Sequence, residues 1–205
     1  PEEYVRGHLL GAINIPFFEL SQWLDRLPKR FTIYLYDTTG QQAAQAARML
    51  QDAGFAAVRA ISGGLVGWWN EVGDAFFIWG EGVEKTPPSG APYYGGYAVK
   101  PQYIVRSYQL VVDLRAPEAY AAGHFPGAVN VALNDLPTWV TTLPSGGGFG
   151  RLYIWCVDED GTSACQAAQW LRGNGYPNAR CMIGGLEQWR IRYGDELLWP
   201  EASEE

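Results

Sequence analysis

Short apolar runs alternate with amphipathic segments along most of the chain. Residues 31–36 (FTIYLY) and residues 56–61 are short runs that predict two strands. Residues 41–53, between them, predict a helix, because their apolar side chains recur at helical spacing. These side chains belong to Ala43, Ala44, Ala46, Ala47 and Leu50. Alternation of this kind favours an α/β fold with an open, mainly parallel sheet flanked by helices.

The same pattern occurs twice in the chain. Segments of the first half return in the same order in the second half, with His8 matched to His124 and Gly63–Gly64 matched to Gly184–Gly185. The matched segments are 1–16 with 117–132, 32–55 with 152–176, and 61–69 with 182–190. A duplication of this length indicates two copies of one domain, because solenoid repeats are only about 20 to 50 residues long.

The duplication predicts two tandem domains. We expect domain 1 over residues 1–83, a linker rich in Pro, Gly and Tyr over residues 84–101, and domain 2 over residues 102–205. Residues 109–115 (QLVVDLR) predict a strand at the start of the second copy. The first copy has no counterpart of it, so we expect the missing strand to lie upstream of Pro1.

The two copies are predicted to differ where a strand meets the following helix. In the second copy we expect a strand over 151–155 and a helix over 162–172, with Thr162 or Ser163 as its N-cap. If Asp37 and Cys156 each end the apolar run, their numbers differ by 119, whereas the glycines that open the helices differ by 121. This alignment predicts two extra residues in the second copy, within an acidic stretch.

Composition and charge exclude several functional classes. A net charge of −7 without a basic run argues against nucleic-acid binding. No apolar stretch approaches the ~18 residues that span a bilayer. Three cysteines without a pairing pattern predict free thiols in a reducing, cytoplasmic compartment, although a chain that opens at Pro1 leaves a removed leader open. Two histidines without a Cys/His cluster make neither a zinc site nor a Ser–His–Asp site.

Three recurring motifs resemble those of the rhodanese superfamily. They are GH-x-x-GA-x-N, a strand that ends in Cys or Asp before a helix, and GG-x-x-x-W. The tandem resembles the two-domain thiosulfate and mercaptopyruvate sulfurtransferases, whose first domain is catalytically silent. The resemblance implies that Asp37 is the silent-site counterpart. It also implies that Cys156 is catalytic, because GTSAC (161–165) resembles the family's helix start.

The resemblance implies sulfur transfer through a persulfide on Cys156. It requires a small sulfur donor and a thiol, cyanide-like or protein-borne acceptor, with no cofactor or metal. A loop at a helix start stabilises a thiolate, because backbone N–H groups and the helix dipole converge there. The loop is predicted to consist of Val157, Asp158, Glu159, Asp160, Gly161, Thr162 and Ser163.

The acidic residues of this loop leave three hypotheses open, because a carboxylate ~7 Å from a thiolate costs roughly 0.6–2.4 kcal/mol. The first is an active sulfurtransferase with an enlarged pocket and an unusual donor. The second is a rhodanese-like module that has lost catalysis and serves in binding or regulation. The third is a lengthened loop like those of dual-specificity phosphatases and arsenate reductases, but such loops need an arginine, which residues 157–163 lack.

The remaining candidates are expected to be structural. Cys165 is predicted to be a small core residue of a helix, and Cys181 a buried residue at a strand end. We expect structural roles for the matched histidines and for Asp113 with Arg115.

Overall fold

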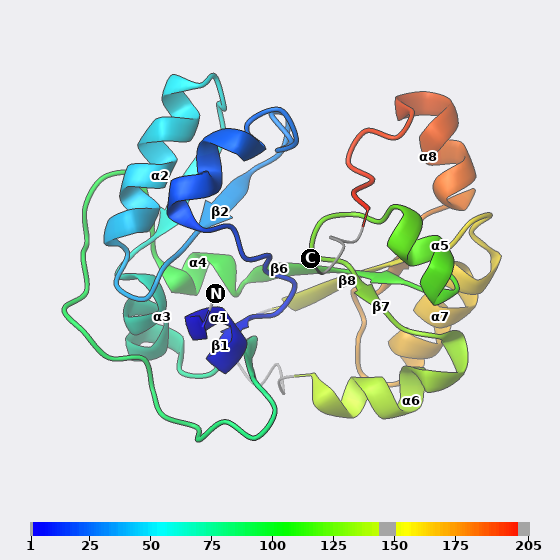
Figure 1. Ribbon diagram of the computed structural model, residues 1–205. Coiled ribbons are helices and arrows are strands. Elements are labelled where there is room, and N and C mark those ends of the chain that lie inside the picture. Colours follow the sequence, from blue (N-terminus) through cyan, green and yellow to red (C-terminus); the bar gives the residue numbers. More distant parts are fainter. Residues whose placement is uncertain (1, 144–150, 201–205) are drawn as a thin grey trace. The chain divides into compact units, whose positions relative to one another are not determined.

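The computed structural model describes residues 2–143 and 151–200, and the chain divides into two compact units. Unit 1 comprises Pro1–Leu9 and Asn14–Arg106. Unit 2 comprises Leu10–Ile13 and Ser107–Glu205. Each unit alternates strands and helices (Figure 1), which confirms the predicted α/β class.

Unit 1 holds five short strands in two sheets. Strands β2, β3 and β5 form a parallel sheet in that order, and β1 pairs with β4 in antiparallel fashion. The elements are α1 Glu2–Arg6, β1 Gly7–Leu9, the 3₁₀ helix Phe17–Trp23, β2 Ile33–Leu35, α2 Gln41–Asp52, β3 Val58–Ile61, α3 Gly64–Val72, β4 Phe77–Trp79, β5 Ala98–Val99 and α4 Pro101–Ile104.

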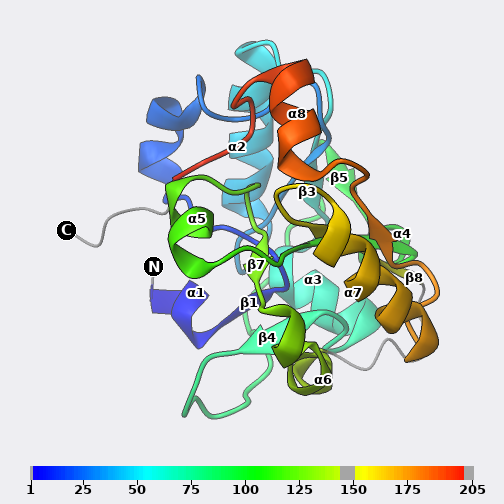
Figure 2. The ribbon, with the colours of Figure 1, turned by 90° about the vertical axis from the view of Figure 1, so that its right-hand side faces the viewer.

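Unit 2 holds a four-stranded parallel sheet in the order β7-β6-β8-β9. Helix α7 runs beside β8 in both ribbon views (Figures 1 and 2). The elements are β6 Ser107–Asp113, α5 Pro117–Ala122, β7 Val129–Asn130, the 3₁₀ helix Leu133–Asp135, α6 Leu136–Trp139, the 3₁₀ helix Val140–Thr142, β8 Arg151–Val157, α7 Thr162–Gly173, β9 Arg180–Cys181 and α8 Gly185–Tyr193.

The two central strands of unit 2 build its core. Strand β6 pairs with β8 along seven residues, and alternate side chains of both strands point to the same face. On one face lie Leu110, Val112, Ile154 and Cys156, all at most 2% exposed. Helix α7 presents a matching row of buried Ala164, Ala167, Ala168 and Leu171. Val157 points to the opposite face, where it packs in a cluster with Phe125 and Leu186.

Two predictions about domain 1 need correction. Residues 84–101 are not only a linker, because Ala98–Val99 form β5 and pair with β3 inside unit 1. The segment Leu10–Ile13, expected in domain 1, belongs to unit 2, and the Tyr108 hydroxyl donates to the Leu10 carbonyl at 2.6 Å. Among the described residues of unit 1, no strand lies beside β2 in the way that β6 lies beside β8. An upstream position for that strand stays a prediction.

Candidate functional site

The loop between β8 and α7 holds a buried carboxylate at the start of the helix. Asp158 is 6% exposed, and its carboxylate accepts hydrogen bonds from the backbone N–H groups of Gly161 at 2.6 Å, Ser163 at 2.7 Å and Ala164 at 3.1 Å. We call these three N–H groups the amide cradle. They are groups that a helix start leaves without partners, and they favour an anion. Asp158 supplies that anion from within the chain.

The same arrangement occurs in unit 1, at Asp37. Its carboxylate accepts from the N–H of Ala43 at 3.2 Å and of Gln42 at 3.4 Å. A constant shift of 121 residues therefore matches Asp37 with Asp158 and both of its donors with the donors of Asp158. The prediction of two extra residues in the second copy is wrong.

Strand register gives the counterpart of Cys156. Leu35 lies opposite Ala60 in unit 1, and Cys156 lies opposite Cys181 in unit 2. Both pairs obey the same 121-residue shift, so Cys156 matches Leu35, a strand residue. Asp37 is the counterpart of Asp158 and not of Cys156.

Cys156 lies inside the core and not at the helix start. Its side chain is fully buried. Burial raises the pKa of the Cys156 thiol to about 12, and the nearby carboxylate of Asp158 adds to the shift, while Arg172 opposes it. The prediction that the N–H groups of residues 157–163 surround Cys156 is wrong, because the cradle binds Asp158. The sulfur sits in a place where its neutral form is favoured.

The other two acidic residues of the loop also have partners. Glu159 contacts two guanidinium groups, those of Arg115 at 3.7 Å and of Arg190 at hydrogen-bond distance. The carboxylate of Asp160 accepts from the Thr162 N–H at 2.8 Å, and this hydrogen bond lowers the pKa of Asp160. The sequence suggests that all three carboxylates act on Cys156. In the structure they do not act together in this way, because each of them has a partner of its own.

The N-cap prediction also changes. Helix α7 begins at Thr162, so its N-cap is Gly161, which has a left-handed φ of 89°. Neither Thr162 nor Ser163 caps the helix. Their N–H groups are donors to Asp160 and Asp158, so two side chains of the acidic loop do the capping.

The paired glycines hold this loop in place. The Leu186 N–H donates to the Asp158 carbonyl at 2.9 Å, and a Cβ on Gly185 would lie 2.6 Å from the same carbonyl oxygen. Gly64 has the same relation to Asp37, whose oxygen would lie 2.4 Å from its Cβ. The duplicated GG motif thus reflects a close backbone approach that only glycine permits.

Asp113 and Arg115 form a buried pair, which agrees with the structural role expected for them. The Arg115 guanidinium donates to the Asp113 carboxylate through Nε at 3.0 Å and Nη2 at 2.7 Å, and to the Gly123 carbonyl at 2.6 Å. Sequence reasoning missed that this arginine also reaches the loop through Glu159. Contact between residues 44 positions apart leaves no local signal in the sequence.

The two histidines have matching structural environments. His8 stacks on Tyr4 with ring centres 4.0 Å apart, and His124 stacks on Tyr120 at 3.8 Å. Each Nδ1 lies within hydrogen-bond distance of the backbone oxygen of the same tyrosine. Burial lowers the pKa of His8. These contacts support the structural interpretation.

Two of the three cysteines form a disulfide. Cys165 of α7 is bonded to Cys181 of β9, and Cys156 is the free one. The prediction of three free thiols is wrong, and Cys165 and Cys181 are half-buried instead of lying in the core. The disulfide also removes part of the reason for expecting a reducing, cytoplasmic compartment.

A thiol count tests this pairing. Unfolded in denaturant without reductant, the chain should expose one thiol to Ellman's reagent, and three after reduction. The Cys165→Ser variant should expose two without reductant, because its Cys181 is freed. Three reactive thiols in the unreduced wild type would contradict the disulfide.

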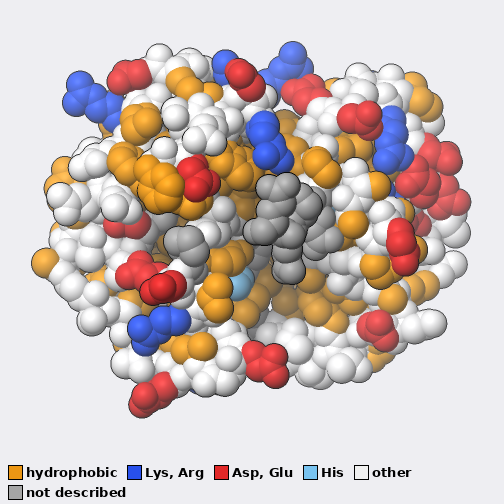
Figure 3. Space-filling view, viewed as in Figure 1, with side chains coloured by type: hydrophobic (Ala, Val, Ile, Leu, Met, Phe, Trp, Pro, Cys, Tyr) orange, Lys and Arg blue, Asp and Glu red, His pale blue; other side chains and the backbone are white. Residues whose placement is uncertain are grey.

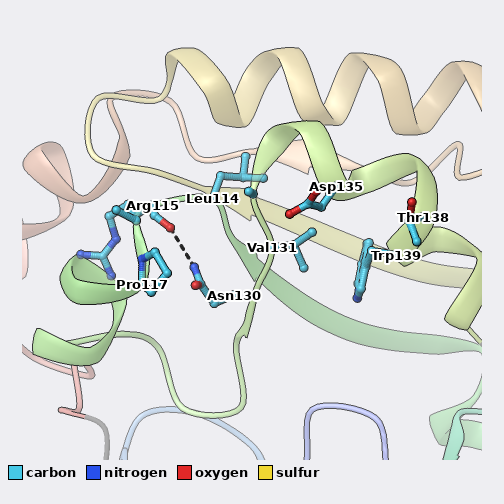
Figure 4. A pocket seen from close by; sticks show the side chains of 10 residues that line it. Leu114, Arg115, Pro117, Asn130, Val131, Asp135, Thr138 and Trp139 are labelled. Carbon is cyan, nitrogen blue, oxygen red and sulfur yellow. Dashed lines mark hydrogen bonds between the residues drawn. The ribbon is translucent and has the colours of Figure 1, made fainter.

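A hollow of about 500 Å³ lies at the carboxyl ends of β6 and β7 (Figure 4). Its polar side chains include Asp135 and Thr138, and Trp139 forms part of its wall. The Asn130 side chain donates to the Arg115 carbonyl at 2.9 Å. The full lining is Leu114, Arg115, Ala116, Pro117, Asn130, Val131, Ala132, Asp135, Thr138 and Trp139. Neither Cys156 nor Asp158 belongs to it.

Surface charge on one face, metal ligands and membrane-spanning character give no further candidate site among the described residues. On the face seen in Figure 3, Lys and Arg side chains lie scattered among Asp and Glu side chains. Within residues 2–143 and 151–200, no three His, Cys, Asp or Glu side chains gather closely enough to hold a metal ion. Over the same residues, no helix has the length and apolar character needed to cross a membrane.

Comparisons with known proteins agree with the motif analysis. A family model described as "Rhodanese-like domain" matches residues 1–71 and 102–192. "Thiosulfate sulfurtransferase GlpE" of Pseudomonas entomophila is 33% identical over 93 residues, which is 45% of this chain and 81% of that protein. "Adenylyltransferase and sulfurtransferase uba4" of Ogataea parapolymorpha is 34% identical over 80 residues, 38% of this chain and 19% of that protein. A crystal structure of thiosulfate sulfurtransferase from Pseudomonas aeruginosa aligns with 97% of this chain and 38% of its own, at 20% identity and a TM-score of 0.36.

Proposed function

We propose that this chain, which belongs to the rhodanese-like domain family, serves as a binding or regulatory module. In this module, Asp158 occupies the place of a sulfur-carrying thiol. The observation that carries the proposal is the amide cradle. All three of its N–H groups donate to the Asp158 carboxylate, and the free thiol of Cys156 is buried in the sheet. Unit 1 has a matching aspartate, Asp37, at the equivalent helix start.

Chemistry supports this proposal as well as geometry. Sulfur transfer of the rhodanese type needs a nucleophile that attacks a sulfane sulfur and then holds it as a persulfide. A carboxylate cannot hold sulfur in that way. A buried thiol whose pKa is raised to about 12 supplies almost no thiolate near neutral pH.

A second candidate function is sulfur transfer through Cys156. It is favoured by the relatives named thiosulfate sulfurtransferase. It requires β8 to separate from α7, so that the sulfur meets a donor such as thiosulfate or mercaptopyruvate and then an acceptor thiol, cyanide or protein. The free-energy cost of exposing this fully buried layer of the core would oppose that movement.

Mass spectrometry distinguishes the two functions. After incubation with thiosulfate or with mercaptopyruvate, the peptide that carries Cys156 should keep its mass, because no persulfide forms. The Cys156→Ala variant is the matched control for sulfur bound elsewhere. Addition of one sulfur atom to Cys156, lost in that variant, would establish sulfur transfer and overturn the proposal.

A further inference from the structure

A segment of unit 1 covers the loop that carries its aspartate. We call residues 90–99 the strap. The Tyr93 N–H donates to the Thr39 carbonyl at 2.8 Å, and the Tyr93 carbonyl accepts from the Gly63 N–H at 2.9 Å. The strap therefore joins the loop that contains Asp37 to the turn that contains the paired glycines.

The strap then continues as an added strand. Its end forms β5, which runs parallel to β3. The N–H groups of Ala60 and Ser62 donate to the carbonyls of Tyr97 and Val99, each at 2.9 Å. The outer edge of β3 is thus closed by the chain itself.

Unit 2 presents the same backbone groups. The shift of 121 residues matches Thr39 with Asp160, and it matches the three strap-bound donors of unit 1 with Cys181, Ile183 and Gly184. Strand β9 is the last strand in its sheet order. Because the Met182 N–H donates to the Cys156 carbonyl, the neighbouring N–H groups of Cys181 and Ile183 point away from β8.

Among residues 2–143 and 151–200, no segment covers these groups as the strap covers those of unit 1. In the part of the chain that the structure describes, neither the Gly184 N–H nor the Asp160 carbonyl has a hydrogen-bond partner. The matching side chains are also more exposed in unit 2 than in unit 1. Ser62 is 7% exposed under the strap, whereas its counterpart Ile183 is 86% exposed. An open edge with an exposed isoleucine is the kind of surface to which an extended segment adds as a strand.

We propose that the edge of β9, together with Gly184 and Asp160, binds an extended segment of a partner protein that adds as a parallel strand. The inference rests on the proposed function, since it names the kind of partner that such a binding module takes. The occupant is argued from unit 1, where residues 93–99 of this chain bind the matching groups in that way.

The side chains of unit 2 define the chemistry of the partner. In unit 1, Tyr94 lies against Gly63 and Gly67, but Gln188 replaces Gly67 in unit 2 and covers Gly184. The partner therefore needs no aromatic residue there. Asp160, which is exposed, replaces the neutral Thr39 of unit 1. A lysine or arginine at the place of Tyr93 and an apolar residue beside Ile183 fit this edge best.

Hydrogen exchange on the full chain tests the open edge, with a defined peptide as the probe. The peptide has the sequence of residues 90–99 with Tyr93→Lys and Tyr94→Ala, because Gln188 fills the place that the Tyr94 ring takes in unit 1. Without it, the N–H groups of Ala60, Ser62 and Gly63 should exchange slowly, and those of Cys181, Ile183 and Gly184 quickly. With the peptide, exchange of the second set should slow at least about tenfold. Protection of the second set without peptide, or no change at saturating peptide, would overturn the proposal.

Two matched variants locate the binding site. Ile183→Glu should weaken peptide binding at least about fivefold, because it places a charge on the edge. Ile191→Glu, at a residue of α8 that is 77% exposed, should leave binding unchanged. Equal peptide affinity for both variants would overturn the proposed site. Self-association of the wild type that Ile183→Glu abolishes would overturn the proposed occupant, since a second copy of the chain would then bind the edge.

The sulfur measurement separates this inference from the proposed function. Sulfur on Cys156 would overturn the non-catalytic function whatever the peptide does. Failure of the peptide with no sulfur on Cys156 would overturn the docking edge alone.

Discussion

Replacing Asp158 with cysteine should create a reactive thiol where the wild type has none. The new sulfur would face the amide cradle at the start of α7, and thiols at helix starts have pKa values of about 3.5 to 7.5. Cys156, with its pKa raised to about 12, is protonated under the same conditions. The lower nucleophilicity of a more acidic thiolate offsets part of the gain. We therefore expect alkylation by iodoacetamide near neutral pH to be at least about 100-fold faster than in the wild type.

The control for this experiment is Cys156→Ala in the Asp158→Cys background. Rapid labelling should persist there, because the reactive sulfur is at position 158. Asp37→Cys provides an independent comparison, since its carboxylate contacts the equivalent N–H groups in unit 1. If Asp158→Cys folds normally, as judged by circular dichroism, and labels no faster than the wild type, the cradle does not activate a thiol.

Removing the Asp158 carboxylate should destabilise the protein more than removing its counterpart. Asp158→Ala leaves three backbone donors at the helix start without their partner, in a buried place. We expect the free energy of unfolding to fall by about 2 to 3 kcal/mol. Asp37 accepts two longer hydrogen bonds and is half-buried, so Asp37→Ala should cost about 1 kcal/mol.

Urea unfolding of the full chain, followed by tryptophan fluorescence, measures both losses. The chain has two units and can show two unfolding transitions. Each transition is assigned to a unit by the variant that shifts its urea midpoint. Equal losses, or a larger loss for Asp37→Ala, would contradict the stronger cap at Asp158. Asp160→Ala is a further comparison, since Asp160 is exposed and accepts one backbone hydrogen bond.

The repeated architecture could be predicted from sequence because it depends on local patterns. The helix expected over 41–53 is α2, and the helix expected over 162–172 is α7. Their apolar faces, Ala43–Leu50 and Ala164–Leu171, are the buried ones. Periodic burial of this kind is visible in a single sequence.

The predicted site lies in the wrong place because it pairs Cys156, at the end of one apolar run, with Asp37, at the end of the other. A gapless shift of 121 residues pairs Ile33 with Ile154 and Asp37 with Asp158, and it was visible in the sequence. The preference for a cysteine at a helix start outweighed that simpler alignment. A shift of two residues matters here because β8 ends at Val157: Cys156 is a buried residue of the strand, whereas Asp158 is in the loop at the helix start.

Other features left no local trace. The Cys165–Cys181 disulfide joins a helix to a strand at a spacing that matches no common motif. The ion pairs of Glu159 depend on Arg115 and Arg190, which are distant in sequence. Strand β5 has two residues and lies in a segment whose many Pro and Gly residues are typical of a linker.

The identity of the group held at the start of α7 is tested most directly by titrating the reactivity of Cys156 in the native wild-type protein. Iodoacetamide labelling of that residue is followed by mass spectrometry from about pH 6 to about pH 11, against a model-thiol pKa of about 8.5. If the cradle binds Asp158, Cys156 should stay unlabelled through neutral pH, and its apparent pKa should lie well above that of the model thiol. Complete labelling with an apparent pKa below about 7 would show an activated thiolate and would contradict this account.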